Sequence, residues 1–301
     1  MKNIKGSLIL LVTAFIWGSA FVAQTTGASH IGAFTFNASR CFVGALFLLV
    51  LVIIREGAAH NKIAIKSIKW PVKGGILCGI VMFFAMGFQQ FGISVYPDNV
   101  AASGRAGFIT AIYVVLVALC EQFRGKKLHY MVIVSVVFTM LGMYFLCLSD
   151  GITNIYIGDV LVFGCAICFT IHILVVDKFK TEDSVKLSCL QFFICGVLSL
   201  ICSLLLESIN MADLRAGLFS ILYAGIFSSG IAYTLQMVGQ KYAEPAVASI
   251  VMSLESVFAA LTGWIVLHEI LSGRELLGCV LVFVSVILAQ LPQFIKSKTV
   301  E

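Results

Sequence analysis

Ten long apolar runs alternate with short polar connections along almost the whole chain. A hydrocarbon core about 30 Å thick requires roughly 20 apolar residues per helical crossing, and each run has about that length. The runs are continuous and lack the alternation of a membrane β-strand. We therefore predict an all-α membrane protein with ten transmembrane helices. The expected spans are 7–26, 31–54, 72–94, 99–121, 128–148, 156–177, 184–206, 216–238, 244–267 and 273–293.

A polar connection recurs in the two halves of the chain at a spacing of 146 residues. In each copy an apolar run ends, a Tyr and an acidic residue mark a turn, and another apolar run begins. The aligned pairs are Gln90 and Gln236, Tyr96 and Tyr242, Asp98 and Glu244, Ala102 and Ala248, and Ser103 and Ser249. Two copies are too few for a solenoid and indicate a duplicated half, which is typical of transporters. With five crossings per half, the second repeat (151–301) would be inverted relative to the first (1–150).

The composition excludes a soluble domain, because 60% of the residues are hydrophobic and only 12% are charged, against about 25% charged in soluble proteins. Only the connection at about 56–71 is long, so no room remains for a soluble catalytic domain. The chain contains no metalloprotease, nucleophile-elbow or P-loop motif, which argues against an enzyme and against a nucleotide-driven pump. A channel is a weaker alternative, since rings of like charge and a carbonyl filter signature are missing.

The distribution of Lys and Arg predicts the orientation. With a cytoplasmic N-terminus, sixteen of the twenty cations fall in inner segments, and only Arg215 and Arg274 in outer ones. Arg40 and Arg105 lie inside apolar runs. This bias predicts a multi-pass protein of the cytoplasmic (inner) membrane with both termini in the cytoplasm. The net charge of +5 then reflects topology, and no nucleic-acid partner is expected.

The ten cysteines lie within or at the edges of apolar runs, where Cys behaves as a small hydrophobe. Even Cys165 and Cys168, which have the spacing of a redox or zinc pair, lack a second pair. We therefore expect packing roles, with no metal and no cofactor. Two pairs of small residues, Ser103 with Gly107 and Ser249 with Ser253, are expected to be structural and to let the fourth and ninth helices cross closely.

Charged residues at membrane depth are rare, costly and usually face a bundle interior. Glu255 lies near the middle of the ninth run and is a candidate ligand for a substrate ammonium or a carrier of protons. The alternative is a structural ion pair with Arg40 or Arg105. Arg105 could instead hold a substrate carboxylate, whereas Arg40 is expected to be structural. Glu121, at the end of the fourth run, is expected to face water.

The paired glutamines are candidate substrate ligands. The third run places Met82 and Met86 on one stripe with Gln89 or Gln90, and the eighth places Tyr233 with Gln236. Polar groups amid Met and aromatic residues suit a cavity for small organic solutes. The alternative is hydrogen bonding between helices.

Two further residues have open interpretations. Trp17 lies in the middle of the first run, away from the interfacial belts, and is either a cavity wall or packing. His172 in the sixth run is either a proton relay or a hydrogen-bonded core histidine.

Several short motifs together resemble the drug/metabolite transporter superfamily in its EamA-like branch. They are Trp17-Gly-Ser-Ala-Phe-Val, Arg40, Ala101-Ala-Ser-Gly-Arg-Ala-Gly-Phe-Ile-Thr-Ala, Ser253-Leu-Glu-Ser-Val-Phe-Ala-Ala and His268-Glu269. The resemblance covers nearly the whole chain and implies a central cavity among helices one, three, four, six, eight and nine. Its members are typically inner-membrane exporters of amino acids, other small metabolites or toxic compounds. This chain lacks the proline found in the middle of the fourth and ninth helices, so a proline hinge is not expected.

These observations predict a secondary-active transporter that exports small metabolites such as amino acids through an alternating-access cavity. Arg105 with Glu255 would match a zwitterion, whereas an efflux transporter for lipophilic cations could dispense with the arginine. Multidrug efflux is therefore the alternative. The expected partners are the lipid bilayer, a small-molecule substrate and a proton as coupling ion, with the chain as a monomer or homodimer.

Overall fold

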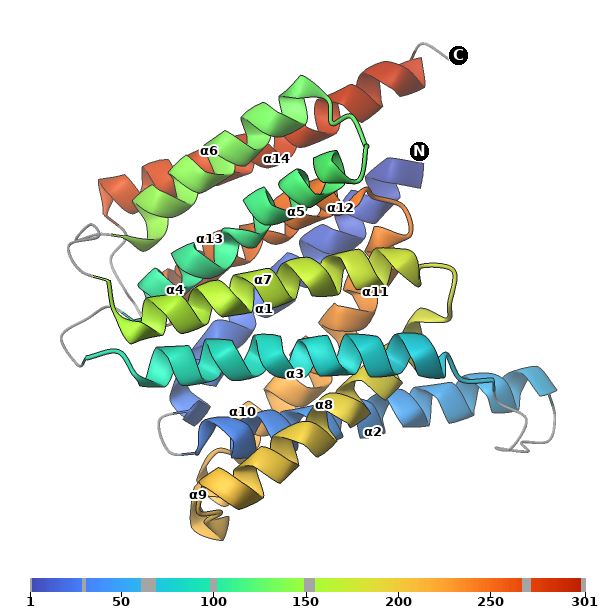
Figure 1. Ribbon diagram of the computed structural model, residues 1–301, viewed down its shortest axis with the longest axis vertical. Coiled ribbons are helices and arrows are strands. Elements are labelled where there is room, and N and C mark those ends of the chain that lie inside the picture. The colour runs from blue at the N-terminus through green and yellow to red at the C-terminus, as the bar shows by residue number, and fades with distance from the viewer. Residues whose placement is uncertain are drawn as a thin grey trace.

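The computed structural model describes residues 2–28, 31–60, 69–97, 102–148, 155–266 and 272–298, and every regular element in them is a helix (Figure 1). Seven crossings are single helices. They are α1 (Lys2–Ala28), α2 (Ala33–His60), α3 (Val72–Ser94), α6 (Tyr130–Cys147), α7 (Ile157–Lys178), α8 (Ser184–Leu206) and α14 (Gly273–Lys298).

The fourth, eighth and ninth crossings are each built from consecutive shorter helices. The fourth joins α4 (Ala102–Ala111) to α5 (Tyr113–Phe123), and the ninth joins α12 (Pro245–Met252) to α13 (Leu254–Val266). The eighth consists of α10 (Leu218–Tyr223), the π-helix η2 (Ala224–Ala232) and α11 (Tyr233–Gln240). A short helix, α9 (Met211–Ala216), precedes it.

The predicted ten-helix fold is confirmed. Among the described residues, nine helical segments are long and apolar enough to cross a membrane, and a shorter apolar segment, Lys5–Ala20, lies in α1. Two expected spans, 72–94 and 184–206, coincide with α3 and α8.

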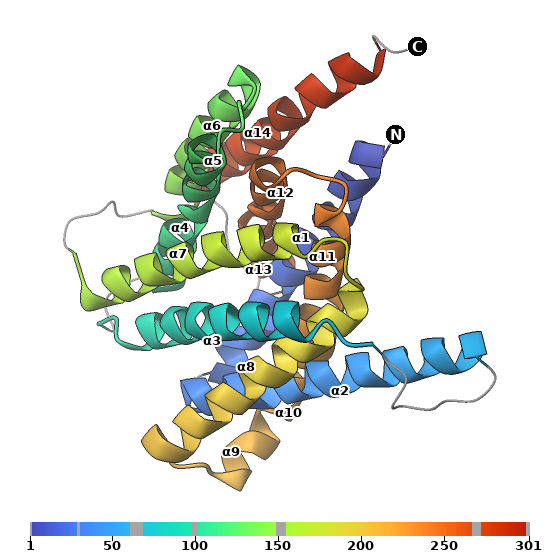
Figure 2. The same cartoon turned by 45° about the vertical axis from the view of Figure 1, so that its right-hand side comes forward.

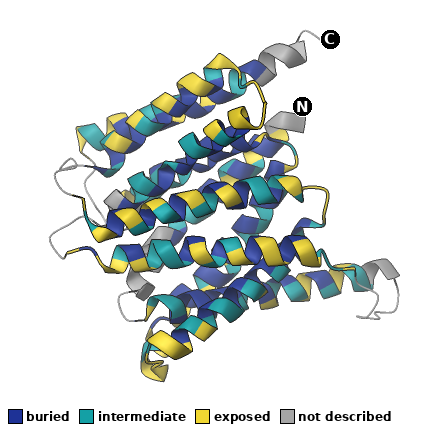
Figure 3. Ribbon diagram, in the orientation of Figure 1, coloured by how far each residue is buried: buried dark blue, intermediate teal, exposed yellow. Residues whose placement is uncertain are grey.

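Exposed apolar stripes cover the outside of the bundle (Figure 3). On α6, for example, Ile133, Val137 and Leu141 are exposed at helical spacing, while Ser135, Thr139 and Gly142 face inward. An apolar surface of this extent would be a liability in water, but it is the ordinary exterior of a protein surrounded by lipid.

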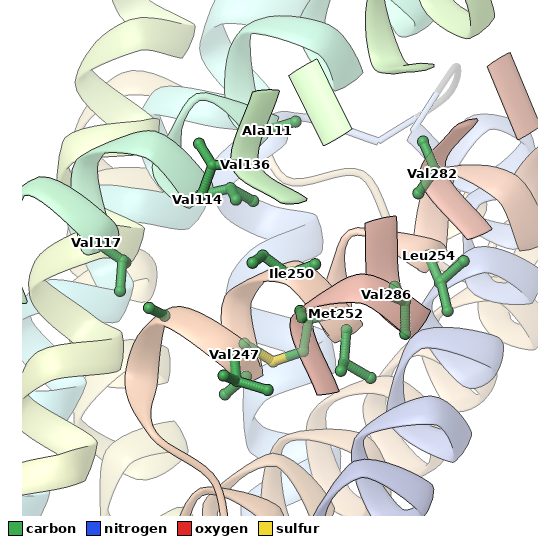
Figure 4. Close-up of a cluster of buried hydrophobic side chains, with 14 of the residues drawn as sticks. Ala111, Val114, Val117, Val136, Val247, Ile250, Met252, Leu254, Val282 and Val286 are labelled. Atoms are coloured by element: carbon green, nitrogen blue, oxygen red, sulfur yellow. The ribbon is translucent and has the colours of Figure 1, made fainter. Parts of the chain in front are cut away.

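The largest apolar cluster joins the fourth, fifth, ninth and tenth crossings (Figure 4). Within this cluster, α6 packs along α14. A Cβ atom added at Gly142 would lie 2.8 Å from the carbonyl oxygen of Gly278, and one at Gly278 would lie 2.7 Å from that of Gly142. Only glycine therefore allows this approach. Thr139 and Ser285 share a hydrogen bond of 2.8 Å across the same contact.

The helices α2 and α8 pack against each other (Figure 2). Polar contacts join them at both ends. At the start of α2, the Glu207 carboxylate accepts from the backbone N–H groups of Phe34 at 2.9 Å and Thr35 at 2.8 Å, and from the Thr35 hydroxyl at 2.7 Å. We call this arrangement the carboxylate clasp. At the other end Arg55 pairs with Asp183, and Lys186 lies 2.7 Å from Glu56.

The two chain ends lie at the same end of the bundle, as an even number of crossings requires (Figure 1). The connection between α5 and α6 lies there too, and it corrects one expectation. Glu121 does not face water. It is fully buried, and Lys126 lies 2.7 Å from its carboxylate. The lysine after the turn folds back onto the end of α5, which compensates the buried charge.

Candidate functional site

A cavity of about 60 Å³ lies inside the bundle. The residues that line it come from α1, α2, α3, α4, α5, α7, η2, α11, α12 and α13. These helices belong to the six crossings that the family resemblance implied, with α2 in addition. The extra helix contributes Arg40, which we had expected to be structural only.

All three interrupted crossings change their helical geometry beside this cavity. Thr110 and Tyr113, which line the cavity, stand on either side of the break at Ile112. Met252 and Glu255 do the same around the break at Ser253. Helical interruptions and π-helices are frequent at functional sites, and discontinuous helices build the binding sites of many transporters.

The break in the ninth crossing arises without a proline. The Ser253 hydroxyl donates to the carbonyl oxygen of Ile250 at 2.7 Å, and the Ser256 N–H bonds to Ser253 three residues back at 3.3 Å. A serine hydroxyl that bonds to a backbone carbonyl in its own helix competes with the regular ladder and bends it. In the fourth crossing the Ile112 N–H likewise bonds three residues back, to Ile109 at 3.1 Å.

Glu255 lines the cavity from α13 and is half-buried. Among the described side chains, none of the ion pairs includes Glu255. Arg40 lines the same cavity from α2, and its guanidinium lies 5.4 Å above the Phe36 ring. The backbone of Arg105 belongs to α4, but its side chain lies outside the described residues. The cavity is thus lined by both a basic and an acidic side chain.

Aromatic rings form much of the cavity wall. Trp17 and Tyr233 have their ring centroids 4.6 Å apart, and Tyr113 and Phe169 lie 6.5 Å apart. Trp17 and Tyr233 were expected at the site. Tyr113 and Phe169 were not, because they look like any other aromatic residue of an apolar run.

The polar wall is incompletely hydrogen-bonded. The indole N–H of Trp17 and the side-chain oxygen of Gln236 are buried without a hydrogen-bond partner among the described residues. Across the cavity, Gln89 donates to the Thr110 hydroxyl at 3.5 Å. Unsatisfied buried polar groups are uncommon and require an explanation, such as a role in ligand binding.

Gln236 lines the cavity as expected, but its counterpart there is Gln89 and not Gln90. Gln90 is half-buried outside the lining. Successive residues of an α-helix point about 100° apart, so only one of two adjacent glutamines can face a narrow cavity. The stripe that contains Met86 passes through Gln89.

His172 lies behind the wall. It is fully buried, and its Nε2 lies 2.8 Å from the Gln191 side-chain oxygen. Its ring meets the edge of Tyr233, with 6.2 Å between centroids. His172 therefore contacts a lining residue without lining the cavity itself.

The expected structural residues are placed as follows. The Tyr113 hydroxyl lies 3.5 Å from the Ser249 carbonyl oxygen, so the fourth and ninth crossings do meet. The hydroxyls of Ser249 and Ser253 bond to carbonyls of their own crossing. Gly107 instead faces Cys147 of α6, 3.7 Å from the position of its missing Cβ. The Ser103 side chain lies outside the described residues.

Comparison with known proteins identifies the family. The EamA-like transporter family matches residues 4–148 and again residues 156–291. The chain belongs to this family. It is 29% identical to an uncharacterized transporter of Archaeoglobus fulgidus, over 97% of this chain and 87% of the relative. It is 23% identical to the uncharacterized transporter YoaV of Bacillus subtilis, over 93% and 94% of the two chains.

A solved crystal structure shares the fold with a TM-score of 0.76 at 17% identity, over 95% of this chain and 98% of that one. With its apolar helices, this EamA-like chain is a multi-pass membrane transporter.

Proposed function

We propose that this EamA-like protein is a secondary-active transporter that exports small metabolites such as amino acids through the central cavity. The observation that carries the proposal is the presence of Arg40 and Glu255 on one small cavity inside the bundle. A guanidinium and a carboxylate on the same cavity complement the carboxylate and the ammonium of a zwitterion.

In this proposal Glu255 binds the substrate ammonium or exchanges a proton, and Arg40 attracts the substrate carboxylate. Trp17, Tyr233 and Gln236 contact the rest of the substrate, since all three line the cavity. Arg105 stays a predicted ligand on the basis of the sequence. His172, which touches Tyr233, would be a relay for protons behind the wall.

We further propose that the cavity lies at the interface of two inverted five-helix repeats, residues 1–150 and 151–301. Its lining comes from α1 to α5 in the first part and from α7, η2, α11, α12 and α13 in the second. Such an interface is where alternating-access transporters hold their substrates.

Flux into proteoliposomes tests the function. The uptake of amino acids, nucleobases and quaternary amines would be measured in proteoliposomes that contain the purified protein, with and without a pH gradient. We expect saturable flux of amino acids that the pH gradient accelerates and that unlabelled amino acid on the opposite side stimulates. Flux without saturation or trans-stimulation would contradict a carrier and favour a channel.

Multidrug efflux is the second candidate, and the aromatic wall is the observation that favours it. Aromatic rings next to a carboxylate bind lipophilic cations through cation–π attraction. Saturable flux of quaternary amines together with no flux of amino acids would select this alternative.

We also propose the cell membrane as location, with both termini in the cytoplasm. Described cations such as Arg124, Lys126, Lys180 and Lys241 flank connections at the end of the bundle that holds the termini, as the positive-inside rule requires. In a variant without native cysteines, an impermeant thiol reagent added outside intact cells should label Asn210→Cys but not Lys127→Cys, an exposed position in the connection between α5 and α6. The opposite pattern would overturn the orientation.

A further inference from the structure

Three sulfur atoms from three helices meet beside the cavity. The Cys41 thiol on α2 donates to the Cys195 sulfur on α8 at 3.6 Å. The Cys195 thiol in turn donates to the thioether sulfur of Met86 on α3 at 3.8 Å. Both cysteines are fully buried, and Met86 is 2% exposed.

We propose that Cys41, Cys195 and Met86 form a binding site for a soft monovalent metal ion such as Cu(I). Thiolate and thioether sulfurs are the ligands that select Cu(I) over harder cations. The described residues contain no group of three His, Cys, Asp or Glu side chains that could hold a metal. The proposed site is not such a group, because its third ligand is a methionine.

The Cys41–Cys195 and Cys195–Met86 sulfur distances are close to the edge length of a trigonal three-sulfur site. With metal–sulfur bonds of roughly 2.3 Å, as thiolates form with the d¹⁰ ion Zn²⁺, the corners of a planar three-sulfur site lie about 4 Å apart. The two measured sulfur–sulfur distances, 3.6 and 3.8 Å, need an expansion of only a few tenths of an ångström.

A second observation separates this cluster from ordinary packing of small apolar groups. Asn37 lies one helical turn before Cys41 on α2, is fully buried, and donates to the Met86 carbonyl oxygen at 3.3 Å. Its own side-chain oxygen is buried without a hydrogen-bond partner among the described residues. This buried acceptor, one helical turn from Cys41, is costly among apolar neighbours but becomes favourable near a cation.

The ion has an entry path, because Met86 lines the central cavity. It would meet the thioether first and then the two thiols behind it. On binding, each thiol loses its proton to the cavity and each sulfur forms one bond to the metal. With both thiolates bound to Cu(I), the site carries one net negative charge. The cationic side chain of Arg40, the residue before Cys41, offsets this charge.

Binding of Cu(I) itself tests the site. Purified protein would compete under anaerobic conditions with a chromogenic Cu(I) chelator at a series of free-ion concentrations. X-ray absorption would then count the sulfur ligands of the most tightly held ion. We expect one ion per chain with three sulfur ligands and a release of protons on loading.

The variants Cys41→Ser and Cys195→Ser should each weaken the tightest binding at least tenfold. Met86→Leu keeps the volume, removes only the thioether, and should lower the ligand count from three sulfurs to two. Cys189→Ser is the matched control. Cys189 lies on α8 with Cys195 and in the same apolar cluster, but its thiol donates to the Ala45 carbonyl at 3.4 Å. The affinity for Cu(I) should therefore stay unchanged in this variant.

Equal affinities in the wild type and the Cys41→Ser and Cys195→Ser variants would overturn the proposal, as would an ion bound mainly through oxygen or nitrogen. If the serine variants do not fold, Met86→Leu and Cys41→Ala still decide the question. Because binding is measured without any transported solute, its failure leaves the proposed transport function untouched, and a failure of amino-acid flux leaves the metal site untouched.

Discussion

The interrupted helices around the cavity and the two ends of the continuous α2–α8 pair differ in how their polar side chains are hydrogen-bonded. At the ends of the α2–α8 pair, carboxylates are matched by backbone N–H groups, hydroxyls or cations, as in the carboxylate clasp. Around the cavity, Trp17 and Gln236 carry polar atoms without a hydrogen-bond partner among the described residues. Satisfied polar groups rigidify a scaffold, whereas unsatisfied ones bordering a cavity remain available to a ligand. The matched contacts at the ends of the pair hold the bundle together. The unpartnered polar atoms at the cavity support our proposal that the substrate binds there.

Glu255→Gln should have the largest effect, and it tests the role of the cavity. We expect flux of amine-bearing solutes to fall at least tenfold and to lose its pH dependence. The protein should remain folded, because none of the described ion pairs includes Glu255. Flux assays in proteoliposomes and size-exclusion profiles in detergent measure the two properties.

The control for the loss of one negative charge is Glu182→Gln, because Glu182 is an exposed residue between α7 and α8. This variant should transport normally. A Glu255→Gln protein with wild-type flux, selectivity and pH profile would rule out both proposed roles of the carboxylate. A protein that fails to fold would instead indicate a structural ion pair.

Glu207→Gln tests the scaffold role of the carboxylate clasp. Glutamine offers one neutral acceptor where the carboxylate accepts three hydrogen bonds, so we expect a loss of roughly 2 kcal/mol in the free energy of unfolding. Thermal unfolding in detergent would show this loss. Substrate selectivity should not change, and a change in selectivity without a loss of stability would refute the role as scaffold.

Thr139→Val tests the second pair of continuous helices, α6 and α14. It removes the hydrogen bond to Ser285 at nearly constant volume, and such bonds are worth about 0.6–1 kcal/mol in membranes. A double-mutant cycle with Ser285→Ala isolates the coupling between the two side chains. Thr234→Val, whose hydroxyl bonds only within its own crossing, is the control. Strict additivity would show that the α6–α14 hydrogen bond contributes nothing.

Asp183→Asn should have the smallest effect and concerns pH. Burial raises the pKa of the Asp183 carboxyl, but the Lys186 N–H and the Arg55 guanidinium together lower it by more, so the net pKa lies below its usual 3.8. The contribution to stability is therefore complete above the unfolded pKa and is lost as the pH falls through the folded pKa. Because the pair with Arg55 is partly exposed, we expect less than about 1 kcal/mol.

In unfolding experiments below about pH 4, the wild type should lose the contribution of Asp183 to the free energy of unfolding. The Asp183→Asn variant should show no such loss. If the free energy of unfolding falls equally with pH in the two proteins, the ion pair between Arg55 and Asp183 is not formed in solution.

The sequence allowed accurate prediction of the helices because hydropathy over some 20 residues is a strong local signal. For this reason α3 and α8 begin and end where the apolar runs do. Interruptions are harder to predict, since neither Ile112 nor Ser253 has a proline beside it. Glu121 was misjudged for a related reason. Its burial depends on Lys126 folding back, which is a contact formed after a turn and not a property of the run.

Candidate ligands could be named from sequence only where a polar group is out of place in an apolar run. Glu255, Gln236 and Trp17 satisfy that condition and line the cavity. Tyr113 and Phe169 also line it, but an aromatic residue in a membrane helix carries no such signal. The choice between Gln89 and Gln90 likewise required the rotation of α3 about its own axis.

The ten-helix architecture of this EamA-like transporter follows from the sequence alone, because a bilayer imposes helical length and hydropathy on each crossing independently of the others. Which faces of those helices meet depends on tertiary contacts. These contacts bring Arg40 to the cavity, place His172 behind its wall and assemble Cys41, Cys195 and Met86 from three helices. The physical reason is that helix rotation and crossing in lipid depend on close contacts between small residues and on interhelical hydrogen bonds, which involve residues far apart in the chain.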